Sequence, residues 1–131
     1  MKFSTIAFIP IFLSILMVGC DPTHNIDFQV MNNTEESIKL VVDYFGTPSD
    51  TNVISSGTTL LFFNDFGIGA TGTEYLDNLE NLPVGLSIFD QAGHSYNKIE
   101  EDISNWQKFY PDKKLDGRGS VELTVRPVDF E

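Results

Sequence analysis

Hydrophobic and polar residues alternate along several short stretches of this chain, which is the pattern of half-buried β-strands. The alternation runs through residues 26–30 and again through 38–44, with a polar turn over 32–36 between them, and it predicts a β-hairpin. The consecutive apolar residues within 58–63 predict a central strand that is covered on both faces.

Three further stretches complete the predicted strands. Residues 84–88 alternate before a turn at 90–93 that ends in glycine, and they predict a hairpin that returns through 94–98. Residues 120–126 form the clearest single strand, which Pro127 ends. Six or seven short strands with Gly, Pro and Asn turns predict an all-β fold, either an antiparallel β-sandwich or a partly open barrel.

Two segments have the spacing of helices instead of strands, and they predict one or two short helices that cover the sheet. The apolar positions are Tyr75, Leu76, Leu79 and Leu82 in the first segment, and Ile99, Ile103, Trp106 and Tyr110 in the second.

The start of the chain has the composition of a cleaved export signal. Lys2 supplies a positive charge, and residues 6–18 are apolar except for Pro10 and Ser14. This run is shorter than the roughly 20 apolar residues that a membrane-spanning helix needs. It leads directly to Cys20, the only cysteine, and the pattern predicts cleavage before Cys20 and attachment of lipid to its sulfur. The alternative is an ordinary secretory signal in which this cysteine has no role.

The predicted organisation is a signal peptide at 1–19, a lipidated tether at 20–25 and one β-sandwich domain at 26–131. Removing 19 residues from the 131 leaves 112, which is enough for a single domain with its own core. If Cys20 carries lipid, the mature chain has no thiol for a disulfide, for redox chemistry or for metal binding.

The mature chain is strongly acidic. Lys2 is the only one of the 8 basic residues before Cys20, and all 19 acidic residues follow it, so 7 basic and 19 acidic residues give a formal charge of −12. Such a surface repels nucleic acid and anionic lipid headgroups, so we expect no nucleic-acid partner. The simplest interpretation is that the charge keeps an exposed domain soluble and monomeric.

Two motifs resemble ligand sites. Residues 67–72 match the G-x-G-x-x-G pattern of dinucleotide-binding loops, but antiparallel strands and a short helix favour a plain glycine loop, and we predict no cofactor. Residues 112–117 have the acid and the glycine of a calcium loop. However, Lys114 occupies a ligand position and Leu123 stands where the bidentate glutamate belongs, so we predict a turn and no metal site. Acidic clusters at 35–36, at Asp77 with Glu80, and at 100–102 are candidates for weak calcium binding, although charged turns of this kind are more often simply solvated.

The sequence gives little support for catalysis, and we predict no catalytic residue. There is no G-x-S-x-G motif, His24 falls in the predicted tether, and His94 follows a turn where exposure to solvent is the ordinary outcome. The aromatic residues around Trp106 are candidates either for the core or for recognition of a sugar or a protein, and core packing is the simpler interpretation.

Several local motifs resemble those of the small uncharacterised lipoproteins of Bacteroidetes-type cell envelopes. They are Cys20 with its lipobox-like approach, residues 28–34, the turn at 89–93, the Asn105-Trp106 pair and the ending at 123–130. The resemblance implies a lipid-anchored protein of the bacterial envelope, with the outer membrane as the expected membrane, and it assigns a role to Cys20 alone.

The function predicted on these grounds is a non-catalytic, lipid-anchored module that binds an envelope protein or a glycan through loops at one end of a sandwich. The ligand-binding residues stay unassigned. One alternative is an acidic inhibitor or immunity protein that caps a cationic enzyme or toxin. Another is a hydrolase, which would need converging carboxylates or a His–acid pair in a cleft.

Overall fold

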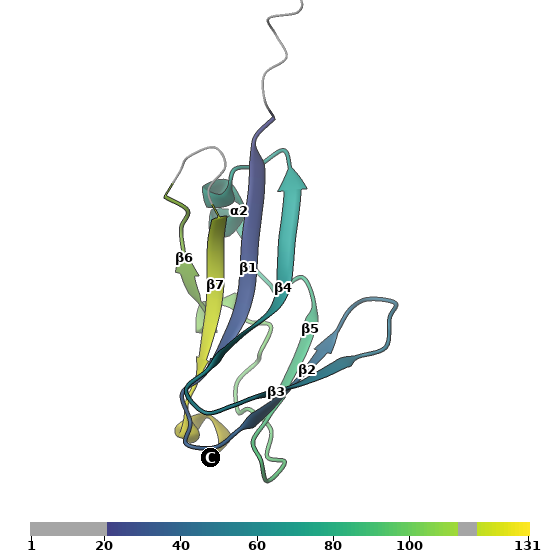
Figure 1. Cartoon of the computed structure of the whole chain (residues 1–131). Helices are drawn as coiled ribbons and strands as arrows, with labels where there is room; N and C mark the ends of the chain where they lie inside the picture. Colours follow the sequence, from purple (N-terminus) through teal and green to yellow (C-terminus); the bar gives the residue numbers. More distant parts are fainter. Residues whose placement is uncertain (1–20, 113–117) are drawn as a thin grey trace, which may run out of the picture.

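The computed structural model describes residues 21–112 and 118–131, which form two β-sheets and one short helix (Figure 1). The large sheet has the order β4-β1-β7-β6, with β1 (Thr23–Asn32), β4 (Thr59–Ile68), β6 (Gln107–Phe109) and β7 (Arg118–Val125). The small sheet has the order β3-β2-β5, with β2 (Ile38–Asp43), β3 (Asp50–Ile54) and β5 (Gly85–Phe89). The predicted sandwich-like all-β class is confirmed, and these sheets do not close into a barrel.

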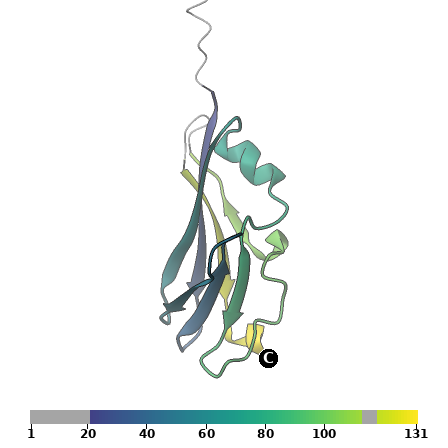
Figure 2. The same ribbon diagram turned by 90° about the vertical axis from the view of Figure 1, so that its right-hand side faces the viewer.

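The core forms on one face of the large sheet. Alternate residues of β1, such as Phe28 and Val30, are fully buried and belong to one cluster with Leu40 of β2 and Ile88 of β5. The small sheet covers this face toward the end of β1, and helix α2 (Gly72–Asn78) covers it next to the start of β1 (Figure 2).

Helix α2 confirms the first predicted helical segment, although it ends earlier than residue 82. Thr71 and Glu74 form a capping box at its start, which satisfies free backbone N–H groups. Leu76 is fully buried on its inner side. The Lys108 ammonium group donates to the carbonyl oxygens of Leu76 and Leu79, where positive charge stabilises a helix end.

The predicted hairpin between 26–30 and 38–44 is wrong, because β1 and β2 lie in different sheets. The antiparallel neighbour of β1 is β4, from Thr23 opposite Ile68 to Met31 opposite Thr59. β1 and β2 both bury alternate residues against the same core, as the alternation predicts. However, the alternation does not identify which strand pairs with which.

One pair of strands also differs from the predicted antiparallel arrangement. β1 and β7 run parallel, from Asn25 opposite Arg118 to Asn32 opposite Val125. Parallel strands need a long connection, and here it consists of all the chain between them. The strand predicted at 120–126 is confirmed as β7, which begins two residues earlier and ends at Val125, and Pro127 begins the 3-10 turn η2 (Pro127–Phe130).

The strand predicted at 58–63 as central and covered on both faces is wrong in its position. It is the first part of β4, an edge strand on which Leu61 is exposed. The pairing steps from Phe28 opposite Phe63 to Gln29 opposite Leu61, so Phe62 is an extra residue in a bulge. The bulge explains why the adjacent Phe62 and Phe63 both contact the core, whereas Leu61 lies on the exposed face.

The second predicted helix is mostly wrong. Residues 103–105 form a single 3-10 turn, η1 (Ile103–Asn105), and β6 follows it. Trp106 lies between them and is buried, with its ring 6.1 Å from that of Phe62 and its Nε1 donating to the Glu100 carbonyl oxygen at 2.8 Å. The interpretation of Trp106 as a core residue is therefore confirmed.

The turn at 90–93 is confirmed, and Gly93 has the expected positive φ of 92°. The return strand is reduced to one bridge, between Phe89 and Ser95, with the Tyr96 amide donating to the Ile88 carbonyl oxygen at 2.9 Å. No helix within residues 21–112 and 118–131 is long and apolar enough to cross a bilayer.

Candidate functional site

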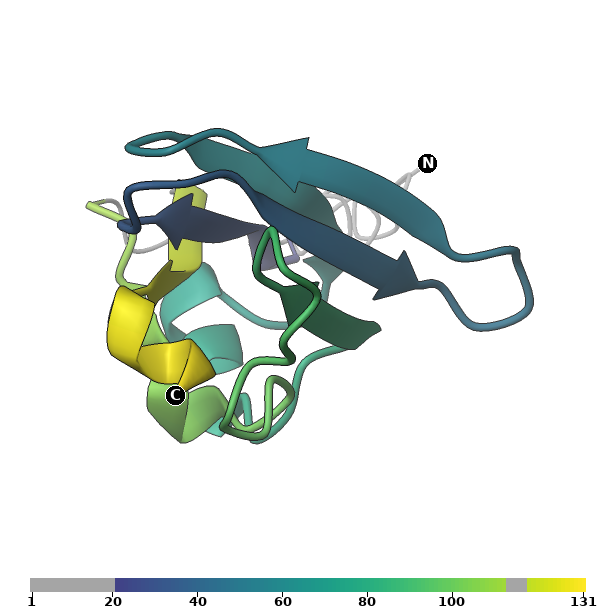
Figure 3. The same cartoon turned by 90° about the horizontal axis from the view of Figure 1, so that it is seen from below.

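The molecule has two distinct ends. The entry end is where β1 starts, beside the end of β4 and α2 (Figure 1). The loop end carries the turns at 33–37 and 90–94 and the C-terminal turn η2, which Figure 3 shows from below in yellow. β1 connects the two, and its ten residues span about 30 Å.

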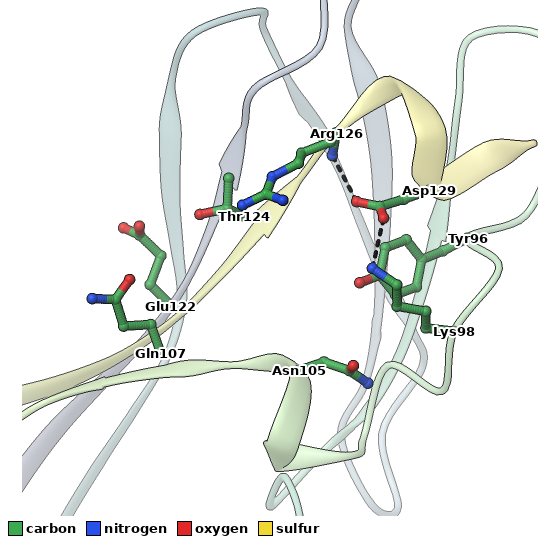
Figure 4. A pocket seen from close by; sticks show the side chains of 8 residues that line it. All are labelled: Tyr96, Lys98, Asn105, Gln107, Glu122, Thr124, Arg126 and Asp129. Atoms are coloured by element: carbon green, nitrogen blue, oxygen red, sulfur yellow. Dashed lines mark hydrogen bonds and ion pairs between the residues drawn. The ribbon is translucent and has the colours of Figure 1, made fainter.

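A polar pocket of about 190 Å³, which we call the η2 pocket, lies on one side of η2 (Figure 4). Its lining combines two amides, two carboxylates, two hydroxyls and two cations, from Tyr96, Lys98, Asn105, Gln107, Glu122, Thr124, Arg126 and Asp129. Side chains with donors and acceptors side by side are suited to a hydroxylated or charged ligand.

Asp129 fixes the geometry of the η2 pocket. Its buried carboxylate accepts from the Lys98 ammonium group at 2.7 Å and from the backbone N–H of Arg126 at 2.8 Å. The bond to Asp129 raises the pKa of Lys98. These two bonds hold η2 in place, and the Asp129 side chain is only 3% exposed, so its main role is structural.

Arg126 differs from the other basic side chains that the structure describes. Lys39 lies over the Phe89 ring, and Lys98 pairs with Asp129. Lys108 donates to the carbonyl oxygens of Leu76 and Leu79, and Arg118 pairs with Asp27. Within residues 21–112 and 118–131, the Arg126 guanidinium has no ion pair with a carboxylate. It leaves a positive charge available at the pocket of an otherwise acidic molecule.

Among the described residues that line the η2 pocket, none presents an open aromatic face for stacking. The Tyr96 ring is buried, with the Lys98 ammonium group 5.6 Å from its centre and the Phe130 ring edge-on at 6.3 Å. A ligand there would therefore be held by hydrogen bonds and charge.

A larger hollow of about 420 Å³, the acidic groove, lies on the other side of η2. Its lining consists of Thr34, Glu35, Glu36, Ser37, Ile38, Asp90, Gln91, Pro127 and Phe130. Three carboxylates therefore lie beside an apolar group made of isoleucine, proline and phenylalanine. The combination is suited to a partner that presents both a basic and an apolar side chain.

One carboxylate of the groove is held by the predicted turn. Asp90 accepts from the backbone N–H of His94 at 2.7 Å and lies 2.7 Å from its Nδ1. Desolvation raises the pKa of Asp90, but the bonds from His94 outweigh it and the net shift is downward. His94 itself is exposed, as predicted.

The sequence-based placement of His24 is wrong. It lies in β1 opposite Gly67, with its side chain 11% exposed and its ring stacked on Tyr75 at 4.4 Å. Its Nε2 is 3.7 Å from Asp65, which also accepts from the Tyr75 hydroxyl at 2.6 Å. Within the described residues, the buried Nδ1 has no hydrogen-bond partner.

This His–Asp–Tyr cluster is packed between a strand and a helix. Neither hollow of the loop end includes its residues. A Cβ at Gly67 would clash with Cε1 of His24, so the glycine makes room for the ring. The cluster is therefore explained by packing at the entry end.

The predicted tether is also shorter than residues 20–25, because Thr23, His24 and Asn25 already pair with β4. The backbone N–H of Gly69 donates to the Pro22 carbonyl oxygen at 2.8 Å and holds the chain one residue earlier. Cys20 and the signal segment lie outside the described residues.

Residues 67–72 run from the end of β4 into the first residue of α2, and a carboxylate of the chain itself lies at the helix start. It belongs to Glu74, whose Oε2 accepts from the Thr71 amide at 2.8 Å and from its hydroxyl at 3.0 Å. These bonds lower the pKa of Glu74. The helix is capped by its own carboxylate.

The acidic residues do not assemble a metal site where the structure describes them. In residues 21–112 and 118–131, no three His, Cys, Asp or Glu side chains are placed to share an ion. Most of the calcium-like segment, residues 113–117, lies outside this part of the chain.

Tyr75 is expected to make the domain less stable in alkali. Burial raises the pKa of its hydroxyl, and the hydrogen bond to Asp65 raises it further. The folded chain therefore keeps a proton that the unfolded chain releases near pH 10, and stability falls as the pH rises above that value. Urea unfolding at about pH 9 and about pH 11, with Tyr75→Phe as the comparison, measures this effect. A drop of the same size in the variant would contradict it.

Comparison with protein-family models, curated proteins and solved structures finds no significant match to this chain. The candidate site therefore rests on its own geometry. Sequence reasoning expected binding loops at one end of the sandwich but missed the η2 pocket, whose residues come from three separate stretches of the chain. The sequence does contain a local signal for η2. Pro127 stands at the first position of the turn and Asp129 follows two residues later, which is typical of the start of a helical turn.

Proposed function

We propose that this protein is a lipid-anchored resident of the bacterial cell envelope and a non-catalytic module that binds an envelope protein or a glycan at its loop end. The observation that carries the proposal is the position of the two hollows. Both adjoin η2, at the far end of β1 from Asp21, the residue that follows Cys20.

The anchor rests on the sequence around Cys20. Residues 6–18 have the length and apolarity of a signal segment, and the sole cysteine follows them directly. Two or three acyl chains on the mature amino terminus are enough for stable anchoring, whereas one is marginal. In Bacteroidetes-type envelopes we expect the outer membrane to be the destination.

Cell fractionation with Cys20→Ser tests the anchor. The variant should remain as an unprocessed precursor or appear in the soluble fraction, because no sulfur is available for the lipid. Adding Ser104→Cys to this variant places a thiol on the exposed η1 turn and should not restore anchoring. A Cys20→Ser protein that is cleaved like the parent and still stays in the membrane fraction would rule out the lipid as the tether.

Site-specific photocrosslinking in cells tests the loop end. A crosslinker at Gln91 in the acidic groove or at Gln107 in the η2 pocket should give a discrete adduct. The control is the exposed Glu80, which lines neither hollow and follows α2. Equal adducts from all three positions would show that the contacts are not specific to the loop end.

The acidic groove specifically favours the second candidate function, an inhibitor or immunity protein that caps a cationic partner. Glu35, Glu36 and Asp90 would attract such a partner, and the attraction weakens as salt screens it. If the photocrosslinked adduct is lost at moderate salt and in Glu35→Gln/Glu36→Gln, the second function is favoured. If it persists under both conditions, the first is favoured.

A further inference from the structure

The outer face of the large sheet carries two exposed apolar side chains at the entry end. Phe66 is 64% exposed and Ile68 is 69% exposed. They are two residues apart in β4, so they point to the same face of the sheet. Gly67 between them faces His24 and α2, so the pair lies on the side that α2 does not cover.

Covalent geometry limits how far this pair can be from Cys20. The Pro22 carbonyl oxygen accepts a hydrogen bond from the Gly69 N–H, and Thr23 lies opposite Ile68 in the antiparallel pair. Three peptide units separate Cys20 from Thr23, and each spans at most about 3.8 Å between Cα atoms. Adding the roughly 5 Å between paired strands, the Cα atoms of Cys20 and Ile68 are at most about 16 Å apart.

This maximum distance between Cys20 and Ile68 is short compared with the thickness of a membrane, whose hydrocarbon core alone is about 30 Å. The headgroup layer on each side of the hydrocarbon core is several ångströms thick, and acyl chains on Cys20 would fix its backbone at that layer. A tether of this length cannot carry the entry end far from the lipid surface.

We propose that Phe66 and Ile68 insert into the headgroup layer of the bilayer that holds the lipid on Cys20, so that the domain stands on its entry end with the loop end directed away. This rests on the proposed lipid anchor. The tether keeps the two side chains at a high local concentration of lipid, so a small apolar pair is sufficient to set the orientation. The acidic net charge restricts the favourable surface to zwitterionic headgroups.

A second copy of the chain is a less favourable occupant. β4 is an edge strand, and edge strands of this length can pair between molecules. However, the bulge at Phe62 breaks the regular spacing of its backbone groups, which is a device that opposes such pairing.

Fluorescence of the lipidated protein in phosphatidylcholine vesicles tests the proposal. The lipid occupies the only natural thiol, so Ile68→Cys provides a unique position for an environment-sensitive dye. Val53→Cys is the matched control, because Val53 is 70% exposed and lies on β3. The dye at position 68 should show blue-shifted emission and several-fold stronger quenching by spin-labelled lipid than the dye at position 53. Adding Phe66→Asp should reduce both effects.

Equal quenching at the two positions would overturn the proposal. A blue shift at position 68 without quenching by lipid would also overturn it and would indicate a second copy instead. Co-sedimentation with the vesicles is measured first, and its absence would count against the anchor itself. Co-sedimentation without a difference between the two dyes would overturn only the insertion of Phe66 and Ile68.

Discussion

Replacing Asn32 with alanine is expected to lower the free energy of unfolding by about 3 kcal/mol. The side chain is fully buried, and its Nδ2 donates to the carbonyl oxygens of Glu36 at 2.7 Å and Ile54 at 2.9 Å. Its Oδ1 accepts from the Thr34 amide at 3.0 Å and from the Thr34 hydroxyl at 2.7 Å. Alanine would leave several of these groups without partners where water has little access, which costs more than the bonds themselves contribute.

Chemical unfolding monitored by circular dichroism measures the loss. Asn33→Ala is the matched control, because Asn33 is the exposed neighbour and should change stability by no more than about 0.5 kcal/mol. Asn32→Asp should be at least as destabilising as the alanine variant, since a carboxylate would face two carbonyl oxygens. If Asn32→Ala behaves like Asn33→Ala, the hydrogen bonds of Asn32 do not stabilise this corner.

The same residue explains why the predicted hairpin was wrong. Polar residues after Asn32 indicate a turn, and the chain does turn there. However, the buried amide of Asn32 bonds to the Ile54 carbonyl at the end of β3, which fixes a corner between two sheets instead of a turn within one. Alternation identified which residues face the core, whereas the pairing of strands depended on contacts that are distant in the sequence.

The sequence did not predict that β4 is an edge strand, for a related reason. Four apolar residues in succession are typical of a buried strand, but one of them, Phe62, is turned into the core by a bulge. The bulge depends on the register against β1, which a single strand does not reveal. A strand at 58–63 was predictable, but its continuation to Ile68 and its neighbours in the sheet were not.

The candidate site was predictable in outline only. The loops at one end of a sandwich were expected to bind, but the η2 pocket needs Lys98, Arg126 and Asp129 to meet around a 3-10 turn. His24 was misplaced because the strand begins earlier than the apolar alternation that marks it, and its ring is held by Tyr75 from a distant helix. Cys20 stays a prediction from sequence.

Replacing Phe28 with alanine is expected to cost about 3–5 kcal/mol, because it removes a large ring from a core that has little room to collapse. Phe28 is fully buried in the middle of β1, and its ring lies 5.6 Å from that of Phe63. A domain of this size typically has about 5–15 kcal/mol of stability in total. The variant should therefore unfold at a much lower denaturant concentration, and part of it should be unfolded without denaturant if the parent is at the lower end of that range.

Phe66→Ala is the matched control, because it makes the same substitution in the neighbouring strand at a position that is 64% exposed. Its loss should be no more than about 0.5 kcal/mol, since solvent already reaches most of the ring. A loss as large as that of Phe28→Ala would mean that Phe66 is packed against the domain and is not available to a membrane. A small loss would show that Phe66 contributes little to folding. Its expected effect is then on the orientation of the lipidated protein on vesicles.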